Sequence, residues 1–301
     1  MKSLLLIALA FHSLFSFEYN LEPKKINSQI YCFFGKPQIM DTHNNGDISN
    51  SCFVDLGKSY LVIDSGPSYK YARDTHKAMK KIKNQEVSFV INTHIHDDHW
   101  LGNGYYKENG ATIIGAKIFA NTPNATPIRM QQYISKEAFD KTEEVFPTKH
   151  IEGVQTLELE GVKVELTSFD KTIHTDNDMI IYIPSQSVVF AGDLVFNERI
   201  MSLRGGNINN WIDVLDEIEA KNSKYIIGGH GNIYTRDSTK ITKRYLEALK
   251  EFVLESIDEG RDITDTLTNS HMSEFEDLKL YKEMHTINVE TAYRTLEWGD
   301  E

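Results

Sequence analysis

The sequence predicts an α/β protein in which two β-sheets pack face to face and helices cover their outer faces. Two groups of short strand-like segments, each followed by helical patterns, indicate this arrangement. No repeat, charge block or long low-complexity linker marks a boundary between the groups. The 301 residues are 40% hydrophobic and 25% charged, which suits a globular protein with a sizeable core.

The first group of strands is predicted from runs of β-branched and aromatic residues. These runs lie at 29–34, 50–57, 59–66, 87–93 and 111–116. Helices are predicted over 68–83 and 127–146. The stretch 35–49 between the first two strands is rich in turn residues and contains Asn45-Gly46. It is equally compatible with a surface hairpin and with a flap that reaches a substrate through Ile39, Met40 or His43.

The second group begins near residue 150. Its strands are expected in VQTLELEG, VKVELTSF, MIIYIPSQ and SVVFAGD, followed by a helix over 207–222 and a short strand over 225–229. Helices are expected over most of 235–298, where paired charges are typical of a solvated outer face. His285 and Tyr293 are candidates for a pocket wall, although packed or exposed positions are more usual for isolated residues of these types.

The N-terminus has the pattern of a secretory signal peptide. Met1-Lys2-Ser3 is followed by the apolar run LLLIALAFHSLFSF, and the chain turns polar at Glu18. We therefore expect a signal peptide at 1–17, a mature domain at 18–301, and a periplasmic or secreted protein. An uncleaved anchor or a buried helix is the alternative, but the run is shorter than the about 20 residues of a spanning helix. No stable membrane insertion is expected after cleavage.

Charge and cysteine content narrow the function. The formal net charge of −12 argues against a nucleic-acid partner, which needs a basic surface. The two cysteines, Cys32 and Cys52, lie in strand-like runs on either side of the turn-rich stretch. They are compatible with a disulfide in an oxidising compartment and equally with two buried thiols.

The stretch INTHIHDDHWLGN, residues 91–103, carries the strongest functional signal. Three histidines and two aspartates lie between His94 and His99, directly after an apolar strand. Residues two apart in an extended segment point the same way, so His94 and His96 can reach one metal ion. Asp98 and His99 follow as the chain turns into a helix and can face a second ion. Trp100 and Leu101 either wall the pocket or pack in the core.

Further ligands are expected in three polar islands that follow apolar strands. These islands offer His174, Asp193 after SVVFAG, and His230 in the glycine-rich GGHG turn. Imidazole and carboxylate ligands suit zinc, and also iron or manganese. Two ions a few ångström apart would share a hydroxide that attacks an acyl carbon, and would stabilise the resulting oxyanion. His12, His43, His76, His150 and His271 are left outside the site.

This order of motifs resembles the metallo-β-lactamase superfamily of metallohydrolases. The matching strings are VIDSG (62–66), THIHDDH (93–99), His174, AGD (191–193) and GHG (229–231). The resemblance implies an αββα sandwich of two mixed β-sheets with helices on the outer faces, and two Zn²⁺ ions per chain at one edge.

The resemblance also implies a role for each residue. One ion would be held by His94, His96 and His174, and the other by Asp98, His99 and His230. Asp193 would bridge the two ions, and Asp64 would support the site through hydrogen bonds. Asp98 would also be catalytic, orienting the nucleophile or relaying its proton.

The expected reaction is hydrolysis of an ester, thioester, lactone or amide bond in a small molecule. Asp193 gives a glyoxalase-II-like ligand set, and true β-lactamases of the superfamily generally lack it, so β-lactam hydrolysis is less favoured. The strings CFFG and NNGDISNSCF and the tail at 288–297 resemble periplasmic zinc metallohydrolases linked to quinoprotein and sulfur oxidation. A mononuclear iron persulfide dioxygenase and a non-catalytic metal-binding protein are two further, less favoured hypotheses. Substrate and oligomeric state stay open.

Overall fold

The computed structural model describes residues 17–121 and 129–299, and its strands form two sheets. Residues 1–16 of the predicted signal peptide lie outside the described residues. The first sheet contains, in spatial order, β1 (Lys24–Lys25), β2 (Ile30–Phe33), β3 (Ser51–Asp55), β4 (Tyr60–Ile63), β5 (Val87–Ile91), β6 (Thr112–Ala116) and β7 (Lys149–Ile151). The second runs in the order β12 (Tyr225–His230), β11 (Val188–Phe196), β10 (Met179–Ile183), β9 (Val162–Ser168) and β8 (Val154–Leu159).

Both sheets are mixed, as the sequence predicts. Strands β1 to β4 pair antiparallel, whereas β4 to β7 pair parallel. In the second sheet only β11 and β12 are parallel among the described strands. One apolar cluster includes Ile30 and Leu61 from the first sheet and Leu166 and Phe190 from the second, so the sheets pack against each other. The predicted α/β sandwich is therefore confirmed.

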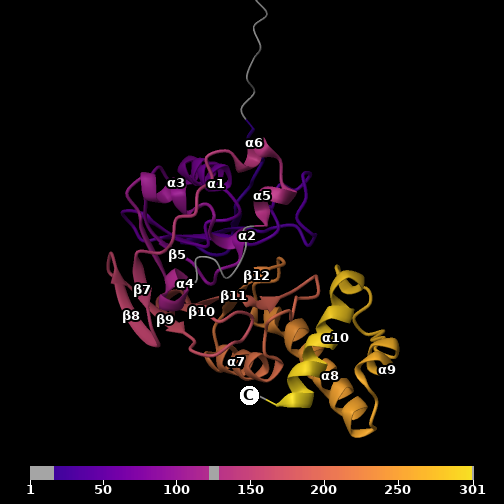
Figure 1. Ribbon diagram of the computed structural model, residues 1–301. Helices are drawn as coiled ribbons and strands as arrows, with labels where there is room; N and C mark the ends of the chain where they lie inside the picture. The colour runs from indigo at the N-terminus through magenta and orange to yellow at the C-terminus, as the bar shows by residue number, and fades with distance from the viewer. Residues whose placement is uncertain (1–16, 122–128, 300–301) are drawn as a thin grey trace, which may run out of the picture.

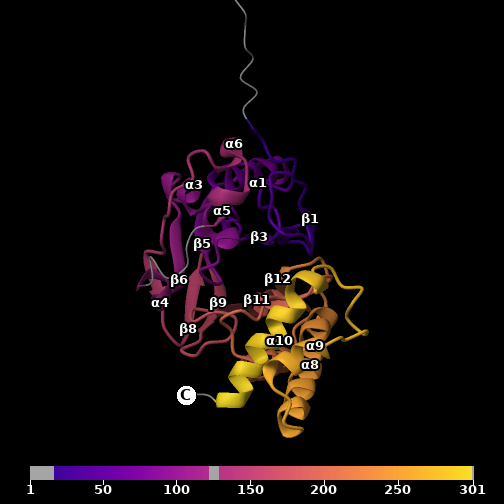
Figure 2. The ribbon, with the colours of Figure 1, turned by 45° about the vertical axis from the view of Figure 1, so that its right-hand side comes forward.

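Helices cover the outer face of each sheet (Figure 1). Helix α1 (Tyr69–Ile82) and helix α3 (Asn103–Glu108) pack on the first sheet. Val62 and Val90 of that sheet belong to one apolar cluster with Met79 of α1. Helices α7 (Ile208–Ala220), α8 (Lys240–Asp258) and α10 (Tyr281–Trp298) pack on the second. Figure 2 shows α8, α9 (Ile263–Thr268) and α10 together on that side of the molecule.

Side-chain caps determine where two of the helices begin. The Ser68 side chain accepts from the backbone N–H of Tyr71 at the start of α1, and Asn207 caps α7 in the same way through Asn210. None of the helices described here is long and apolar enough to cross a membrane.

The long helix expected over 127–146 is wrong. The structure instead has α5 (Met130–Tyr133) and α6 (Lys136–Phe139), separated by extended backbone at Ile134. Ser135 causes the break because its side chain accepts from the backbone N–H of Ala138 and caps α6, which requires a non-helical backbone at the cap. The remaining short helices are α2 (Asp97–Trp100), α4 (Lys117–Asn121) and two 3₁₀ turns at Pro184–Gln186 and Arg236–Thr239.

Four residues considered as candidates for a pocket wall lie in the core instead. Trp100 packs against Phe119 and Phe146, and Leu101 is fully buried. His285 contacts the Tyr245 hydroxyl and the Ser270 carbonyl oxygen instead of the pocket. Tyr293 likewise donates to the carbonyl oxygen of Arg261.

Cys32 and Cys52 form a disulfide between neighbouring strands. The two residues are directly opposite in the β2–β3 register, and their Cα atoms are 4.1 Å apart. The hypothesis of two free thiols is therefore wrong for this fold. The disulfide closes the chain segment that contains the turn-rich stretch 35–49.

Candidate metal centre

Seven side chains converge where the ends of strands from both sheets meet. They form two adjacent groups in which the nitrogen and oxygen atoms lie within 4.8 Å of one another. The first group consists of His94, His96, His174 and Asp193, and the second of Asp98, His99 and His230. The structure thus brings together the seven residues that the sequence predicts, and the five histidines and Asp98 divide as predicted, while Asp193, predicted to bridge, falls in the first group. Of the five excluded histidines, His12 lies outside the described residues, and the other four belong to neither group.

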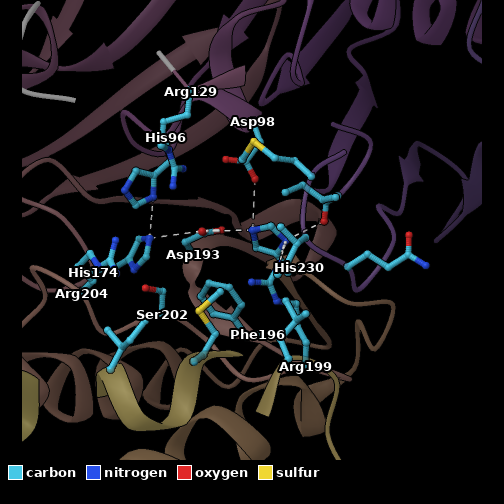
Figure 3. A pocket seen from close by; sticks show the side chains of 17 residues that line it. His96, Asp98, Arg129, His174, Asp193, Phe196, Arg199, Ser202, Arg204 and His230 are labelled. Carbon is cyan, nitrogen blue, oxygen red and sulfur yellow. Dashed lines mark hydrogen bonds and ion pairs between the residues drawn. The ribbon is translucent and has the colours of Figure 1, made fainter. Parts of the chain in front are cut away.

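Asp193 lies between the two groups (Figure 3). Its Oδ2 is 3.4 Å from His174 Nε2 and 3.3 Å from His230 Nε2, and its Oδ1 is 3.1 Å from His99 Nε2. Asp98 Oδ2 lies 3.5 Å from the nitrogens of both His99 and His230. Each of these carboxylates therefore faces the imidazoles of more than one histidine.

The HxHxDH string is shaped by the end of β5 and the start of α2. His94 and Ile95 form a bend after the strand, and His96 keeps extended backbone immediately before the helix. Residues from two other loops hold the first turn of α2 in place. The Ser49 hydroxyl donates to the Asp98 carbonyl oxygen, and the Ser65 N–H donates to the His99 carbonyl oxygen. The helix turn thus holds Asp98 and His99 toward the second group.

Hydrogen bonds fix the ring nitrogens of two histidines. His99 Nδ1 lies 2.9 Å from Asp64 Oδ2, and His230 Nδ1 lies 2.7 Å from the carbonyl oxygen of Ile48. Because a carboxylate or carbonyl oxygen only accepts, each Nδ1 carries a proton, and Nε2 is the ring nitrogen that faces the centre. The predicted supporting role of Asp64 agrees with this geometry.

Several buried polar atoms at the centre have no hydrogen-bond partner among the residues that the structure describes. These include Nε2 of His94, Nε2 of His99 and Oδ1 of Asp193. An unpartnered buried polar atom is costly, and these atoms all face one another. A divalent cation satisfies them because imidazole nitrogen and carboxylate oxygen are its usual ligands. The residues present therefore fit a metal site.

Burial and neighbouring charges shift the pKa values of several side chains at the centre. Burial lowers the pKa of His94 well below its ordinary value and that of His96 to about 3, so both are neutral ligands. Burial raises the pKa of Asp193, but His230, His99 and His94 outweigh it and hold that pKa well below the usual range. Burial lowers the pKa of His99, whereas the carboxylates of Asp193, Asp98 and Asp64 raise it well above normal. Metal binding would displace that proton.

Other residues position the centre without a sequence signal of their own. Asp178 accepts from the backbone N–H groups of His174 and Thr175, which fixes the turn that carries His174. Asn50 donates from Nδ2 to the carbonyl oxygens of Gly228 and Gly231 on either side of His230. Asp178 stands in a polar island that the sequence does single out, whereas Asn50 has no such context.

A pocket of about 230 Å³ opens beside the two groups (Figure 3). Its wall includes Ile39 and Met40, which places the stretch 35–49 at the site as the flap hypothesis expects, whereas His43 is not part of the wall. Gln38 and Ile48 of the same stretch also line the pocket. Sequence reasoning missed the contributors outside this stretch, which are Arg129, Phe196, Arg199, Ser202, Arg204, Leu280, Met284 and Ile287. They come from three distant segments, so only the fold brings them together.

Comparison with known sequences gives one family. A sequence profile described as the metallo-beta-lactamase superfamily matches residues 44–230, more than half of the chain. A protein named metallo-beta-lactamase type 2 from Elizabethkingia meningoseptica is 23% identical over 269 residues, covering 84% of this chain and 95% of that protein. Another of the same name from Bacillus sp. (strain 170) is 22% identical over 192 residues, covering 62% and 67%.

Solved structures show the same fold at low identity. A metallo-beta-lactamase from Pontibacter korlensis superposes with a TM-score of 0.61 at 18% identity, covering 75% of this chain and 99% of that one. The sec-alkylsulfatase Pisa1 from Pseudomonas sp. gives 0.67 at 16% identity, covering 93% of this chain and 51% of that one. At these identities the likeness concerns the fold alone.

Proposed function

The chain belongs to the metallo-β-lactamase superfamily and is a metal-dependent hydrolase, and we propose that it is an exported dinuclear zinc enzyme. In this proposal it cleaves an ester, thioester, lactone or amide bond of a small molecule. The observation that carries the proposal is the position of Asp193, whose carboxylate contacts histidines of both ligand groups. A carboxylate in this position can offer one oxygen to an ion in each group.

We assign each residue of the centre a role. His94, His96 and His174 would hold one ion, Asp98, His99 and His230 the other, and Asp193 would lie between them. Bound zinc ions supply an activated water molecule near neutral pH and polarise a carbonyl oxygen. Asp98, buried at the pocket wall, would orient the attacking water through its carboxylate and accept a proton there.

Two observations support zinc and export. Five imidazoles and two carboxylates form a nitrogen-rich set that zinc accepts readily. The apolar run after Met1-Lys2-Ser3 is typical of a signal peptide, and the Cys32–Cys52 disulfide is typical of an oxidising compartment. Such a protein would most simply bind its zinc ions after export.

Hydrolysis of β-lactams is the second candidate, because two curated relatives carry the name metallo-beta-lactamase type 2. Asp193 makes it the less favoured reaction, since true β-lactamases of the superfamily generally lack an aspartate there. β-Lactams therefore belong in the substrate panel beside esters, thioesters and lactones.

The first test is a metal count on the chain from residue 18, purified without chelator. About two zinc ions per chain are expected by mass spectrometry, with fewer in Asp193→Ala and His230→Ala, because these variants remove a shared ligand and a second-group ligand. Asp237→Ala, at an exposed position outside the centre, is the matched control. One iron ion that survives His230→Ala would overturn the proposal and favour persulfide oxidation.

A further inference from the structure

One wall of the pocket comes from outside the segment that matches the family profile. The profile ends at residue 230, whereas Leu280, Met284 and Ile287 line the pocket at the start of α10. Positions three and four apart share one face of a helix, so Met284 and Ile287 present a continuous apolar surface with Leu280 at its end. All three side chains are half-buried. The pocket thus has an apolar face formed by the start of α10.

The start of this wall is held in an unusual backbone conformation. Leu280 has φ +61°, in the left-handed region that a bulky side chain rarely adopts. Hydrogen bonds on the preceding residue hold it there: the Lys279 N–H donates to the Glu198 carbonyl oxygen, and the Ile200 N–H donates to that of Lys279. Such conformations persist where the surroundings enforce them, and they cluster at ligand sites.

A buried amide attaches α10 to the same segment a second time. Asn288 Oδ1 accepts from the N–H of Leu203, and its Nδ2 donates to the carbonyl oxygen of Met201. Ser202, between these two residues, lines the pocket. Helix α10 and the segment 198–204 are therefore one rigid wall, and not a loose C-terminal appendage.

The wall also carries positive charge among its apolar and polar residues. Arg129, Arg199 and Arg204 line the pocket, and its only carboxylates among the described lining residues are Asp98 and Asp193. Arg129 has a partner, because its Nη2 lies 3.4 Å from Asp97. Within the described residues no carboxylate forms an ion pair with Arg199 or Arg204, although Arg199 is only 7% exposed.

These charges favour an anionic ligand. The chain as a whole carries a net charge of −12, so three arginines around one cavity are not a consequence of general basicity. Arg199 already donates to the Ile200 carbonyl oxygen and lies 3.3 Å from His230 Nδ1. Arg204 is the better candidate for a carboxylate, sulfate or phosphate group of a ligand, which a guanidinium binds through two parallel hydrogen bonds. Arg204 is exposed at the pocket and can meet such a group as it enters.

We propose that the pocket selects anionic amphiphiles: an apolar chain lies on Leu280, Met284 and Ile287, and an anionic group binds Arg204. This inference rests on the proposed hydrolase function and adds the substrate class to it. The cavity of about 230 Å³ restricts the enclosed chain to a short one. The bond to be cleaved would lie between the two ends, beside Asp98 and Asp193.

Binding of non-hydrolysable probes tests the proposal separately from catalysis. Calorimetry on the zinc-loaded protein compares hexanesulfonate with ethanesulfonate, which has a shorter chain, and with 1-hexanol, which has no charge. We expect hexanesulfonate to bind at least about tenfold more tightly than either, because four additional methylene groups and one charge each contribute. Equal affinity for the two sulfonates, or for hexanesulfonate and hexanol, would overturn the proposal.

Two variants locate the parts of the subsite. Arg204→Gln should weaken both sulfonates about tenfold and leave hexanol unchanged. Met284→Gln should reduce the preference for the longer chain at least about threefold, because a polar amide replaces apolar surface on the wall. Arg244→Gln and Leu254→Gln, both on α8 and outside this pocket, are the matched controls. Unchanged sulfonate binding in Arg204→Gln would mean that the anion binds elsewhere, and would refute the proposal.

The outcome is distinguishable from failure of the proposed function. The metal count and the substrate screen test the hydrolase, and neither uses a variant of Arg204 or Met284. Sulfonate selectivity without ester, thioester, lactone or amide cleavage would uphold the subsite and refute the reaction. Cleavage without preference for anionic or apolar substrates would do the opposite. The wild-type chain-length comparison needs no variant, so a misfolded variant does not leave the question open.

Discussion

Replacement of Asp64 by asparagine tests how strongly the second ligand group depends on a residue that does not face the metals. Asp64 is 2% exposed, and its carboxylate accepts three hydrogen bonds. Oδ1 accepts from the backbone N–H of Thr93, and Oδ2 accepts from the Thr93 hydroxyl and from His99 Nδ1. All three partners donate, so the site has no place for an NH₂ group.

The asparagine must nevertheless point its NH₂ group at one of these donors. The backbone N–H of Thr93 cannot reverse its polarity, whereas the Thr93 hydroxyl can rotate and His99 can move its proton to Nε2. The oxygen of Asn therefore stays on Thr93, and His99 takes the tautomer in which Nε2 carries the proton. That nitrogen is the one that faces Asp98 and Asp193. It cannot bind a metal ion until His99 returns to the tautomer with the proton on Nδ1.

The cost is estimated from the bond that is lost. A hydrogen bond to a charged group contributes about 1.5–3 kcal/mol, which corresponds to a decrease of about 10–100-fold in affinity for the second metal. Competition titration with a chromophoric chelator measures both dissociation constants, with Asp237→Asn as an exposed control. The reasoning is refuted if Asp64→Asn binds the second ion as tightly as the wild type, or if only the first site weakens.

Three further variants test separate parts of the structure. Burial raises the pKa of Asp47 to about 6, so its ionised form destabilises the fold at higher pH. Asp47→Asn should therefore increase the free energy of unfolding, measured in urea, by about 2–3 kcal/mol above pH 6. Below pH ~4 the variant should have almost no effect, because Asp47 is protonated in both the folded and the unfolded state. Gly229→Ala would place Cβ 1.9 Å from Asp193 Oδ1 and should lower the metal count, whereas Gly104→Ala, with no atom closer than 3.7 Å, should not. Cys32→Ser should lower unfolding free energy by about 3 kcal/mol, given the 20-residue separation of the disulfide, and a stability equal to wild type would contradict that role.

The clustering of the seven candidate ligands was predictable because its signals are local. His94 to His99 form one contiguous string after an apolar strand, and the other ligands follow strands in short polar islands. Strands that end at the same edge of a sandwich bring such islands together without further information. The cap at Ser135 is also a local signal. It was overlooked because the helical pattern of the predicted helix 127–146 continues across it.

The pocket wall was not predictable for a different reason. Arg204 and Met284 are 80 residues apart in sequence, and no motif relates them. Their proximity depends on Asn288 and on the backbone pairing of Lys279 with the segment 198–200, which are tertiary contacts without a periodic pattern. The same holds for Asn50, whose amide matters only because Gly228 and Gly231 fold beside it.

The attachment of α10 to the segment 198–204 has a consequence for the order of assembly. During synthesis the chain emerges from its N-terminus, so the ligand string at 94–99 is made long before His230 and longer still before Asn288. Until Asn288 is in place, the segment that carries Arg199 lacks its two side-chain anchors to Leu203 and Met201. A growing chain thus carries candidate ligands of both groups before the pocket wall is complete. The substrate selection proposed above would become possible only after α10 has packed against this segment.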